Sequence, residues 1–277
     1  MNSKVCTVAE AMAEVHDGDM IAAHFWGVAG SPGYLFRALI ERGVRDLTVC
    51  MNNFLPVPPT LGEMGFADPT GLLPQIRKII TAFMGTRAFG SMNAEFLGTR
   101  VEDGTLEIES TTHGVLIERL HAGAMGLGGF YNPIGVGTTV EKGKEKRTID
   151  GVEYLFEGPL RPDVGLVKAA RADTRGNLVY RGSARGANPV IAMASRYTIA
   201  EVFEIVELGE LDPEMVVTPG VYIDRIVRIP DDDPYSLKQR PETIQAIVTY
   251  ALTRLAEEEA AAAAERALQE DRQGGVQ

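Results

Sequence analysis

The chain has 277 residues, a hydrophobic share of 45% and a formal net charge of −11. This length suits one large α/β domain or two small ones, and the acidic balance argues against non-specific nucleic-acid binding, which needs a basic surface. No apolar run approaches the roughly 18 residues of a membrane span, and the N-terminus lacks the apolar core of a signal peptide. We therefore expect a cytoplasmic protein with neither a nucleic acid nor a membrane as its partner.

The sequence lacks the motifs of several common kinds of catalytic and metal-binding site. Cys6 and Cys50 are the two cysteines, and both lie in apolar contexts. They form neither a disulfide framework nor a metal-ligand cluster, so we predict buried free thiols and no metal site. A Walker phosphate loop, a zinc motif and a Ser-His-Asp hydrolase pattern are not found either.

The sequence predicts a short amphipathic helix at 7–16, with Thr7 and Glu10 as a capping box. Residues 17–32 then read as a turn, a strand, a glycine loop and the start of a helix. The apolar run at 20–25 is typical of a strand buried on both faces. Ser31 is the expected N-cap of the next helix and Pro32 a residue of its first turn. A glycine loop before a helix start can bind an anionic ligand such as phosphate, or it can be an ordinary tight turn between the strand and the helix.

Alternating strands and helices continue along the chain and predict a parallel sheet. Further helices are expected at 34–42, 72–78, 91–97, 114–122, 189–194 and 236–272. Further strands are expected at 46–53, 78–84, 105–110, 151–156, 164–169, 178–180, 198–206, 216–219 and 221–227. The predicted fold class is α/β, a mainly parallel sheet flanked by helices, with one domain at 1–230 and a C-terminal helical extension at 231–277.

The residues suited to chemistry lie mainly near predicted strand ends. His24 falls in the first strand, where it fits a core position as well as a site, and His113 lies at a strand-to-helix junction, where it faces a cleft or caps the helix. Glu107 and Glu109 share one face of a strand, which suits a general acid or base as well as a solvent-facing surface. His16 and His121 are expected on helix surfaces.

Two other segments stand out by composition. Asn52 and Asn53 end the second predicted strand, a place where βα loops carry function. The glycine-rich stretch at 123–137 contains aromatic residues and a proline, which predicts a structured loop. Such a loop can shape a pocket or form a rigid turn on the sheet. The charged run at 141–147 is expected to be an exposed turn.

The order of these blocks resembles the α subunit of the family I CoA-transferases, of the 3-oxoacid (acetoacetyl-CoA) type. The family's first signature is Asp-Gly, three apolar residues, Gly-Gly-Phe and Gly-x-Pro, and here Asp17-Gly18, Ile21-Ala22-Ala23 and Gly30-Ser31-Pro32 fit it. Other matching blocks are GVRDLT at 43–48, Asn52-Asn53, GGFYNPIGVGT at 128–138, RPDVGLVKA at 161–169, GNLVY at 176–180 and TPG at 218–220.

The resemblance implies an enzyme that is active only with a β subunit, as a heterodimer or heterotetramer. In this family a glutamate attacks an acyl-CoA thioester, passes through an acyl anhydride and becomes a glutamyl-CoA thioester, from which CoA moves to a carboxylic acid. The glutamate belongs to a Ser-Glu-Asn-Gly motif of the β subunit, which this sequence lacks. Coenzyme A is then a substrate, and no tightly bound cofactor is expected.

The same resemblance assigns roles to residues of this chain. The stretch of His24, Phe25, Trp26, Gly27, Val28, Ala29 and Gly30 corresponds to the loop that binds CoA. Asn52 or Asn53 would donate an amide hydrogen to the developing oxyanion. Gly128, Gly129 and Phe130 would shape the acyl or pantetheine channel.

Two departures from the family pattern fall at the implied site. The family's Gly-Gly-Phe is His24-Phe25-Trp26 here, and its Pro-Gln-Gly is Thr112-His113-Gly114. An acyl-CoA hydrolase or a C–C-cleaving enzyme, such as a ring-opening hydrolase, that uses His24 or His113 is therefore an alternative to a transferase. A non-catalytic subunit that only stabilises its partner is a third.

Overall fold

The computed structural model describes residues 3–24, 30–54, 69–83 and 94–233, together with residues 249 and 253. The first half contains α1 Val8–Met12, β1 Met20–Ala23, α2 Gly33–Arg42, β2 Leu47–Asn53, the 3₁₀ helix η1 Pro69–Gln75, β3 Ile76–Phe83, α4 Ala94–Glu102, β4 Glu107–Ser110 and α5 His113–Ala124. The second half contains β5 Phe130–Asn132, η3 Thr139–Glu141, β6 Lys146–Ile149, β7 Val152–Glu157, β8 Val164–Asp173, β9 Leu178–Val179, η4 Gly182–Arg185, α6 Asn188–Ala194, β10 Tyr197–Val206, η5 Pro213–Met215, η6 Gly220–Tyr222 and β11 Arg225–Arg228.

The main sheet confirms the predicted α/β class. Its strands run in the order β11-β10-β8-β1-β2-β3-β4, and every neighbouring pair on this path is parallel. β9 adds one antiparallel pairing to β8. From β1 the chain adds β2, β3 and β4 in turn on one side of β1. It then crosses to the other side, where β8 pairs with β1, so the direction in which strands are added reverses between β1 and β8. In open α/β sheets ligands bind at the carboxyl ends of the strands beside such a reversal.

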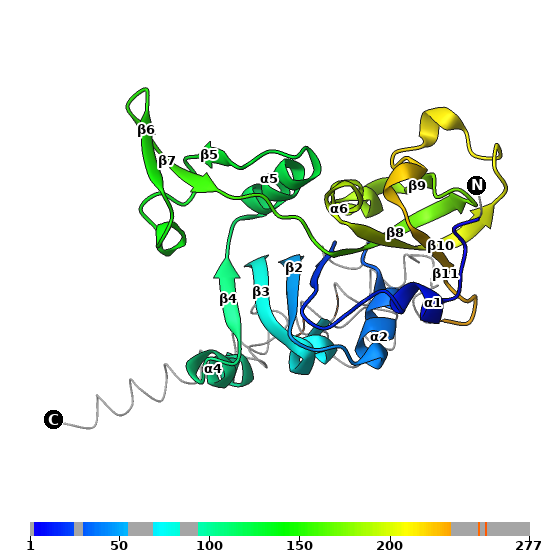
Figure 1. Ribbon diagram of the computed structural model, residues 1–277, viewed down its shortest axis with the longest axis horizontal. Coiled ribbons are helices and arrows are strands. Elements are labelled where there is room, and N and C mark those ends of the chain that lie inside the picture. The colour runs from blue at the N-terminus through cyan, green and yellow to red at the C-terminus, as the bar shows by residue number, and fades with distance from the viewer. Residues whose placement is uncertain are drawn as a thin grey trace.

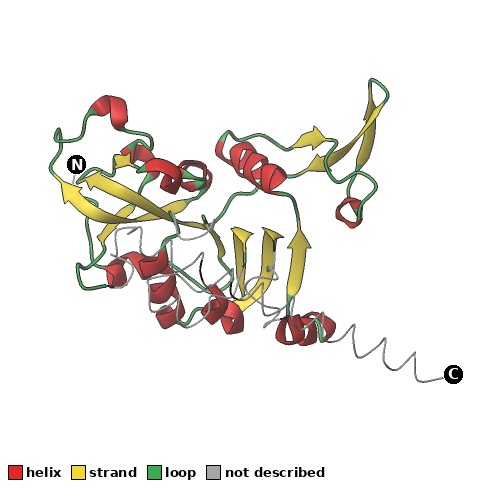
Figure 2. Cartoon of the chain, turned by 180° about the vertical axis from the view of Figure 1, so that it is seen from behind, coloured by secondary structure: helices red, strands yellow, loops and turns green. Residues whose placement is uncertain are grey.

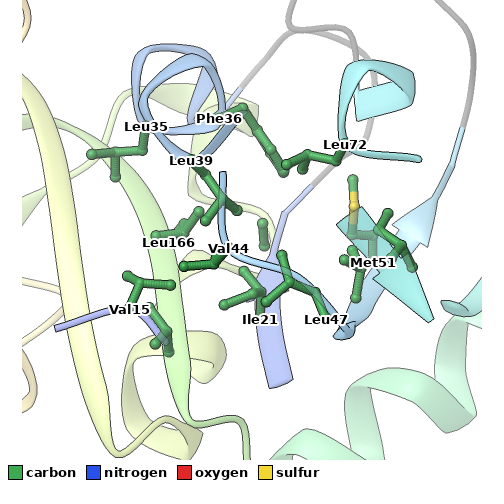
Figure 3. Close-up of a cluster of buried hydrophobic side chains, with 14 of the residues drawn as sticks. Val15, Ile21, Leu35, Phe36, Leu39, Val44, Leu47, Met51, Leu72 and Leu166 are labelled. Carbon is green, nitrogen blue, oxygen red and sulfur yellow. The ribbon is translucent and has the colours of Figure 1, made fainter. Parts of the chain in front are cut away.

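Helices cover both faces of this sheet (Figure 1). One hydrophobic cluster joins β1 and β2 to α1, α2 and η1, and Figure 3 shows part of it, with Leu39 of α2 directed toward Val44 and Leu166. The other cluster joins the opposite face to α5 and α6 through Leu116, Leu120 and Ile191 among others. We call these the α2 face and the α5 face.

A second, antiparallel sheet of three strands projects beyond α5, as both overall views show (Figures 1 and 2). Its strand order is β5-β7-β6. Arg119 of α5 connects it to the body, because its Nε donates to the carbonyl of Gly158 at 2.9 Å and lies 4.0 Å from the buried Glu157. The glycine-rich stretch thus contributes a strand, β5, that its composition did not predict.

Several sequence predictions need correction. The strand expected at 216–219 is wrong, because this segment meets the sheet only by a single bridge between Thr218 and Leu178. Pro219 has no N–H to donate to a ladder, and the chain turns at Gly220–Tyr222 before β11 begins at Arg225 rather than at Val221. Ser31 is not the N-cap of α2: that position is Pro32, which makes no side-chain capping hydrogen bond.

Elsewhere the local structure agrees with the sequence predictions only in part. Thr7 and Glu10 form the expected capping box of α1, although the helix ends at Met12. Gly43 ends α2 with a left-handed φ of 72°, as a glycine after a helix often does. The helix expected at 72–78 is instead the 3₁₀ segment at Pro69–Gln75, and Lys78 belongs to β3. The charged run at 141–147 is only partly a turn, since it includes the first two residues of the exposed strand β6.

Among the described residues, no helix has the length and apolar character that a membrane crossing needs. Of the predicted extension at 231–277, only Thr249 and Thr253 are described beyond residue 233, and both are helical. The division at residue 230 therefore stays a prediction.

Candidate functional site

Neighbouring strands bring the polar candidates to the carboxyl edge of the sheet. His24 directly follows β1, Asn52 and Asn53 end β2, and Thr111 directly follows β4. The register pairs Ala22 with Cys50 and Ala23 with Met51, so the next positions along the two strands, 24 and 52, are neighbours. His24, Asn52 and Asn53 are each 5–7% exposed.

Strand alternation separates the two asparagines. Cys50 packs in the cluster on the α5 face and Met51 in the cluster on the α2 face. Because side chains alternate along a strand, Asn52 shares the α5 face and Asn53 the α2 face. Ala22 packs on the α5 face as well, which places His24 beside Asn52. The structure thus distinguishes two residues that the sequence left equivalent.

Helix α5 begins at the same edge. Thr112 is its N-cap and accepts a hydrogen bond from the Val115 N–H. His113 is the first helical residue and is half-buried, and burial lowers the pKa of its imidazole below the ordinary value. The ring is therefore neutral at pH 7 and can accept a proton. The hydroxyl of Thr111, 6% exposed, has no hydrogen-bond partner within the described part of the chain.

The surroundings of His24 give its ring a different character. The backbone N–H of Ala187 donates to its Nδ1 at 3.3 Å. An accepting Nδ1 carries no proton, so the neutral ring bears its proton on Nε2. In this state Nδ1 has its lone pair engaged and Nε2 has none to offer.

The remaining predicted site residues lie elsewhere or outside the described ranges. Phe25, Trp26, Gly27, Val28 and Ala29 are outside the described residues. Gly30 is described and adopts a φ of 76°.

The glycine loop before β5 belongs to the small sheet. Gly129 packs on the ring of Phe156 and the backbone of Glu157, and Phe130 pairs with Glu157 in the ladder between β5 and β7. Gly128 is exposed just before this ladder. These three residues therefore lie in the projecting sheet rather than among the strand-end residues.

The two glutamates of β4 are held in ion pairs. Lys78 Nζ lies 2.8 Å from a carboxylate oxygen of Glu107 and 2.8 Å from one of Glu109. Glu109 also pairs with Arg119 of α5. Burial alone would raise the pKa of Glu109, but the hydrogen bonds from Lys78 and Arg119 outweigh it and the pKa is lowered. This arrangement fits a structural role better than that of a general acid or base.

Sequence reasoning missed a group of residues that surround the start of α2. Lys168 of β8 and Glu201 of β10 form an ion pair with 3.0 Å between Nζ and Oε1, and Glu201 is fully buried. Burial raises the pKa of Glu201, and the charge of Lys168 opposes this shift. A lysine and a glutamate in the middle of buried strands were the available signal, because charges are rarely buried without a partner.

The comparisons with known proteins agree with this architecture. The family model for coenzyme A transferase matches residues 5–228. This chain belongs to the coenzyme A transferase family.

Its relatives carry different substrate names. The chain is 42% identical over 228 residues to the alpha subunit of the acetate CoA-transferase of Escherichia coli, covering 82% of this chain and 97% of that protein. It is 40% identical over 230 residues to the A subunit of a probable succinyl-CoA:3-ketoacid coenzyme A transferase of Bacillus subtilis, covering 82% and 90%. Among solved structures, a cysteine-to-serine variant of the decarboxylase AibA/AibB matches with a TM-score of 0.67 and 26% identity, over 94% of this chain and 97% of that one.

Proposed function

We propose that this chain is the α subunit of a two-subunit CoA-transferase, which moves CoA from a 3-oxoacyl-CoA or other short-chain acyl-CoA to a carboxylic acid. The observation that carries the proposal is the chemistry of the α5 face at the strand ends. Asn52, Thr111 and a neutral His113 offer hydrogen bonds there, whereas Glu107 and Glu109 are bound to Lys78. The relatives are named as alpha or A subunits, which supports a second subunit as partner. The family resemblance implies that this partner brings the reactive carboxylate.

The proposed reaction conserves the thioester energy through covalent intermediates. A carboxylate of the partner attacks the thioester carbonyl, the CoA thiolate leaves, and an acyl anhydride forms. The thiolate then attacks the glutamyl carbonyl and releases the first carboxylic acid, which leaves a glutamyl-CoA thioester. The acceptor carboxylate repeats these steps in reverse and departs as the new acyl-CoA, with the glutamate restored.

This chain would supply the wall opposite that nucleophile. We assign to the Asn52 amide the donation of a hydrogen bond to the oxyanion that develops on the thioester carbonyl, an interaction of several kcal/mol in other enzymes. The stretch from His24 to Gly30 would bind CoA, and the loop at 128–130 would shape the acyl or pantetheine channel. These assignments rest on the family resemblance and on the strand-end position of His24 and Asn52.

One observation favours a second candidate, a CoA-thioester hydrolase or C–C-cleaving enzyme. His113 stands where the family pattern has glutamine, and its lowered pKa leaves it a neutral base at pH 7. The decarboxylase AibA/AibB resembles this chain over nearly its whole length. In this candidate His113 or His24 takes a proton from water or from the substrate; His113 is favoured because the Nδ1 of His24 accepts the Ala187 N–H.

An assay with the assembled enzyme separates the candidates. The chain is co-expressed with the product of the neighbouring reading frame, and labelled acyl-CoA is supplied with and without acetate, succinate or a 3-oxoacid. We expect label to move into a new acyl-CoA only when an acceptor acid is present. Free CoA released at the same rate without any acceptor, and abolished by His113→Gln, would instead establish the second candidate.

A further inference from the structure

Two polar residues of the candidate site lie in one row across the sheet, with an alanine between them. The register pairs Met51 of β2 with Thr81 of β3, and Thr81 with Ser110 of β4. The next residues along these strands are therefore neighbours too, and they are Asn52, Ala82 and Thr111. The Thr111 N–H donates to the Thr81 carbonyl at 3.0 Å, which continues the parallel ladder to this row. Figure 1 shows the three strands side by side, with their carboxyl ends toward α5.

The three residues of the row share one face of the sheet. Ile80 packs in the cluster on the α5 face, and Glu109 forms an ion pair with α5. Because side chains alternate along a strand, Ala82 and Thr111 lie on the α5 face together with Asn52. The row thus has an amide and a hydroxyl on either side of a single methyl group, that of the half-buried Ala82.

The Thr111 hydroxyl makes no hydrogen bond within the described part of the chain. Thr111 is 6% exposed, and its Oγ1 is buried. The neighbouring hydroxyl of Thr112 caps α5, so the helix start does not require that of Thr111. A buried hydroxyl without a partner costs free energy, and native proteins rarely keep one unless water or a ligand binds it. Thr111 is therefore a donor for a bound molecule.

The spacing of the row indicates how far apart two bound oxygens lie. Neighbouring strands are about 4.8 Å apart, so donors on Asn52 and Thr111, two strands apart, are separated by about 10 Å. A hydrogen bond of about 2.9 Å at each donor leaves about 4 Å between the two accepting oxygens. An oxygen on the third carbon of an acyl group, or a carboxylate on its fourth carbon, fits this distance from the thioester carbonyl oxygen.

The charges beside Thr111 favour a neutral oxygen over a carboxylate. Lys78 and Arg119 are the cations next to Glu109, and both are paired with it. Burial lowers the pKa of His113, so its ring is neutral at pH 7. A bound carboxylate would meet neutral donors and the nearby carboxylate of Glu109, whereas an oxo group carries no charge.

We propose that Thr111 is a specificity-determining residue, whose hydroxyl donates a hydrogen bond to an oxo oxygen on the third carbon of the acyl group while Asn52 binds the thioester carbonyl. The acyl chain then crosses Ala82, the smallest side chain of the row. The proposal rests on the proposed function in taking acyl-CoA as the substrate and Asn52 as the first donor. It assigns to one hydroxyl the distinction between a 3-oxoacyl group and a plain acyl group of equal length.

The test compares acetoacetyl-CoA with butyryl-CoA, which has the same chain length and no 3-oxo oxygen, in steady-state kinetics of the assembled enzyme. Thr111→Val removes the hydroxyl and nearly keeps the shape of the side chain. It should lower kcat/KM about tenfold or more for acetoacetyl-CoA, and less than about threefold for butyryl-CoA. If the wild type does not turn over butyryl-CoA, its inhibition constant against acetoacetyl-CoA takes the place of kcat/KM.

A third substrate and a matched control sharpen this comparison. A larger loss for succinyl-CoA than for acetoacetyl-CoA in Thr111→Val would assign the hydroxyl to a carboxylate and overturn the proposal. Ser110→Ala is the control, because Ser110 precedes Thr111 on β4 but lies on the opposite face and is exposed. Its constants for all three substrates should stay at the wild-type values.

A change at Ala82 keeps the test decisive if Thr111→Val does not fold. Ala82→Val adds two methyl groups between the donors, so kcat/KM should fall about tenfold or more for acetoacetyl-CoA. It should fall less than about threefold for acetyl-CoA, whose acyl group ends before Ala82.

Equal losses for acetoacetyl-CoA and butyryl-CoA in Thr111→Val, or for acetoacetyl-CoA and acetyl-CoA in Ala82→Val, would overturn the proposal. An enzyme that hydrolyses acyl-CoA without transfer would refute the proposed function alone, since the same ratios can be measured for hydrolysis.

Discussion

Two strand ends of one sheet each carry a histidine, and their surroundings give the two rings different chemistry. His24 after β1 is 5% exposed and accepts an N–H from Ala187. His113 after β4 is half-buried at a helix start, with a lowered pKa. The first ring is fixed by a backbone that contacts it, and the second can take up a proton as the pH falls. The role of a histidine therefore cannot be assigned from its residue type and its distance from a strand end. The hydrogen bond at one ring nitrogen distinguishes the two rings.

The largest effect is expected at Asn52, beside His24. If its amide stabilises the oxyanion, Asn52→Ala lowers kcat about 10²- to 10³-fold. Asn53→Ala, on the α2 face, is the control and should change kcat only a few-fold. Steady-state kinetics of the assembled enzyme measure both, and equal losses would contradict the assignment of the site to the α5 face.

A second prediction concerns the structural role of His24. His24→Phe leaves the Ala187 N–H without its acceptor, so we expect the free energy of unfolding to fall by about 1–3 kcal/mol. His16→Phe is the matched change at an exposed position, with 66% of the side chain accessible, and should leave stability nearly unchanged. Denaturant titration of the assembled enzyme distinguishes the two. A His24→Phe variant as stable as the wild type would show that the contact with Ala187 contributes little.

The third prediction tests whether the ring at the end of β4 titrates. The pKa of His113 is lower in the folded state than its ordinary value of 6.5, so stability linked to it is present above pH 6.5 and is lost as the pH falls through the folded pKa. His113→Gln should lose less stability than the wild type between pH 7.5 and 5.5, by about 1 kcal/mol or less. Denaturant titration at the two pH values measures the difference, and identical losses in both proteins would show that the ring does not titrate in this range.

The same variant separates the functions. A transferase should keep activity within about threefold, because glutamine is the family's residue there, whereas a hydrolase that needs a base should lose most of its activity. His121→Gln, on the same helix but beside Glu118 at the surface, is the control for both measurements. A loss in His121→Gln as large as in His113→Gln would mean that the effect comes from the helix as a whole.

The smallest effect is expected at the ion pair between Glu109 of β4 and Arg119 of α5. The pKa of Glu109 is lowered, so its contribution to stability is present above the ordinary pKa of 4.5 and is lost as the pH falls through the lower folded value. Glu109→Gln should reduce stability by about 0.5 kcal/mol at pH 7 and much less at pH 3. Chemical denaturation at the two pH values checks this, and an equal loss at both would exclude an ionic contribution.

Much of the fold could be predicted from the sequence because the local signals agree with the tertiary structure. The second predicted strand, β2, is buried along its whole length, and Thr7 and Glu10 form the capping box that their spacing indicates. The sequence predictions fail where tertiary contacts, rather than local residue preferences, set the conformation of the chain. Gly220 is pressed against the Arg175 carbonyl, which turns the chain where a strand was expected.

The candidate site was predictable only in part. The strand ends were identified, but sequence alternation alone did not say which of Asn52 and Asn53 faces α5, because the positions before them are apolar and buried on both faces. The contacts of the buried Asn188 could not be predicted from the sequence, for a different reason. Its bond to the Gly30 carbonyl spans 158 positions of the sequence, and the β8–β1 pairing brings the two segments together.

One measurement tests most directly whether the reactive carboxylate comes from another chain. The assembled enzyme is incubated with acyl-CoA, treated with borohydride to reduce any glutamyl-CoA thioester, and digested for mass spectrometry. The account predicts a reduced glutamate on a peptide of the partner and none on a peptide of this chain. A reduced glutamate within this chain, or full turnover by this chain purified alone, would contradict it.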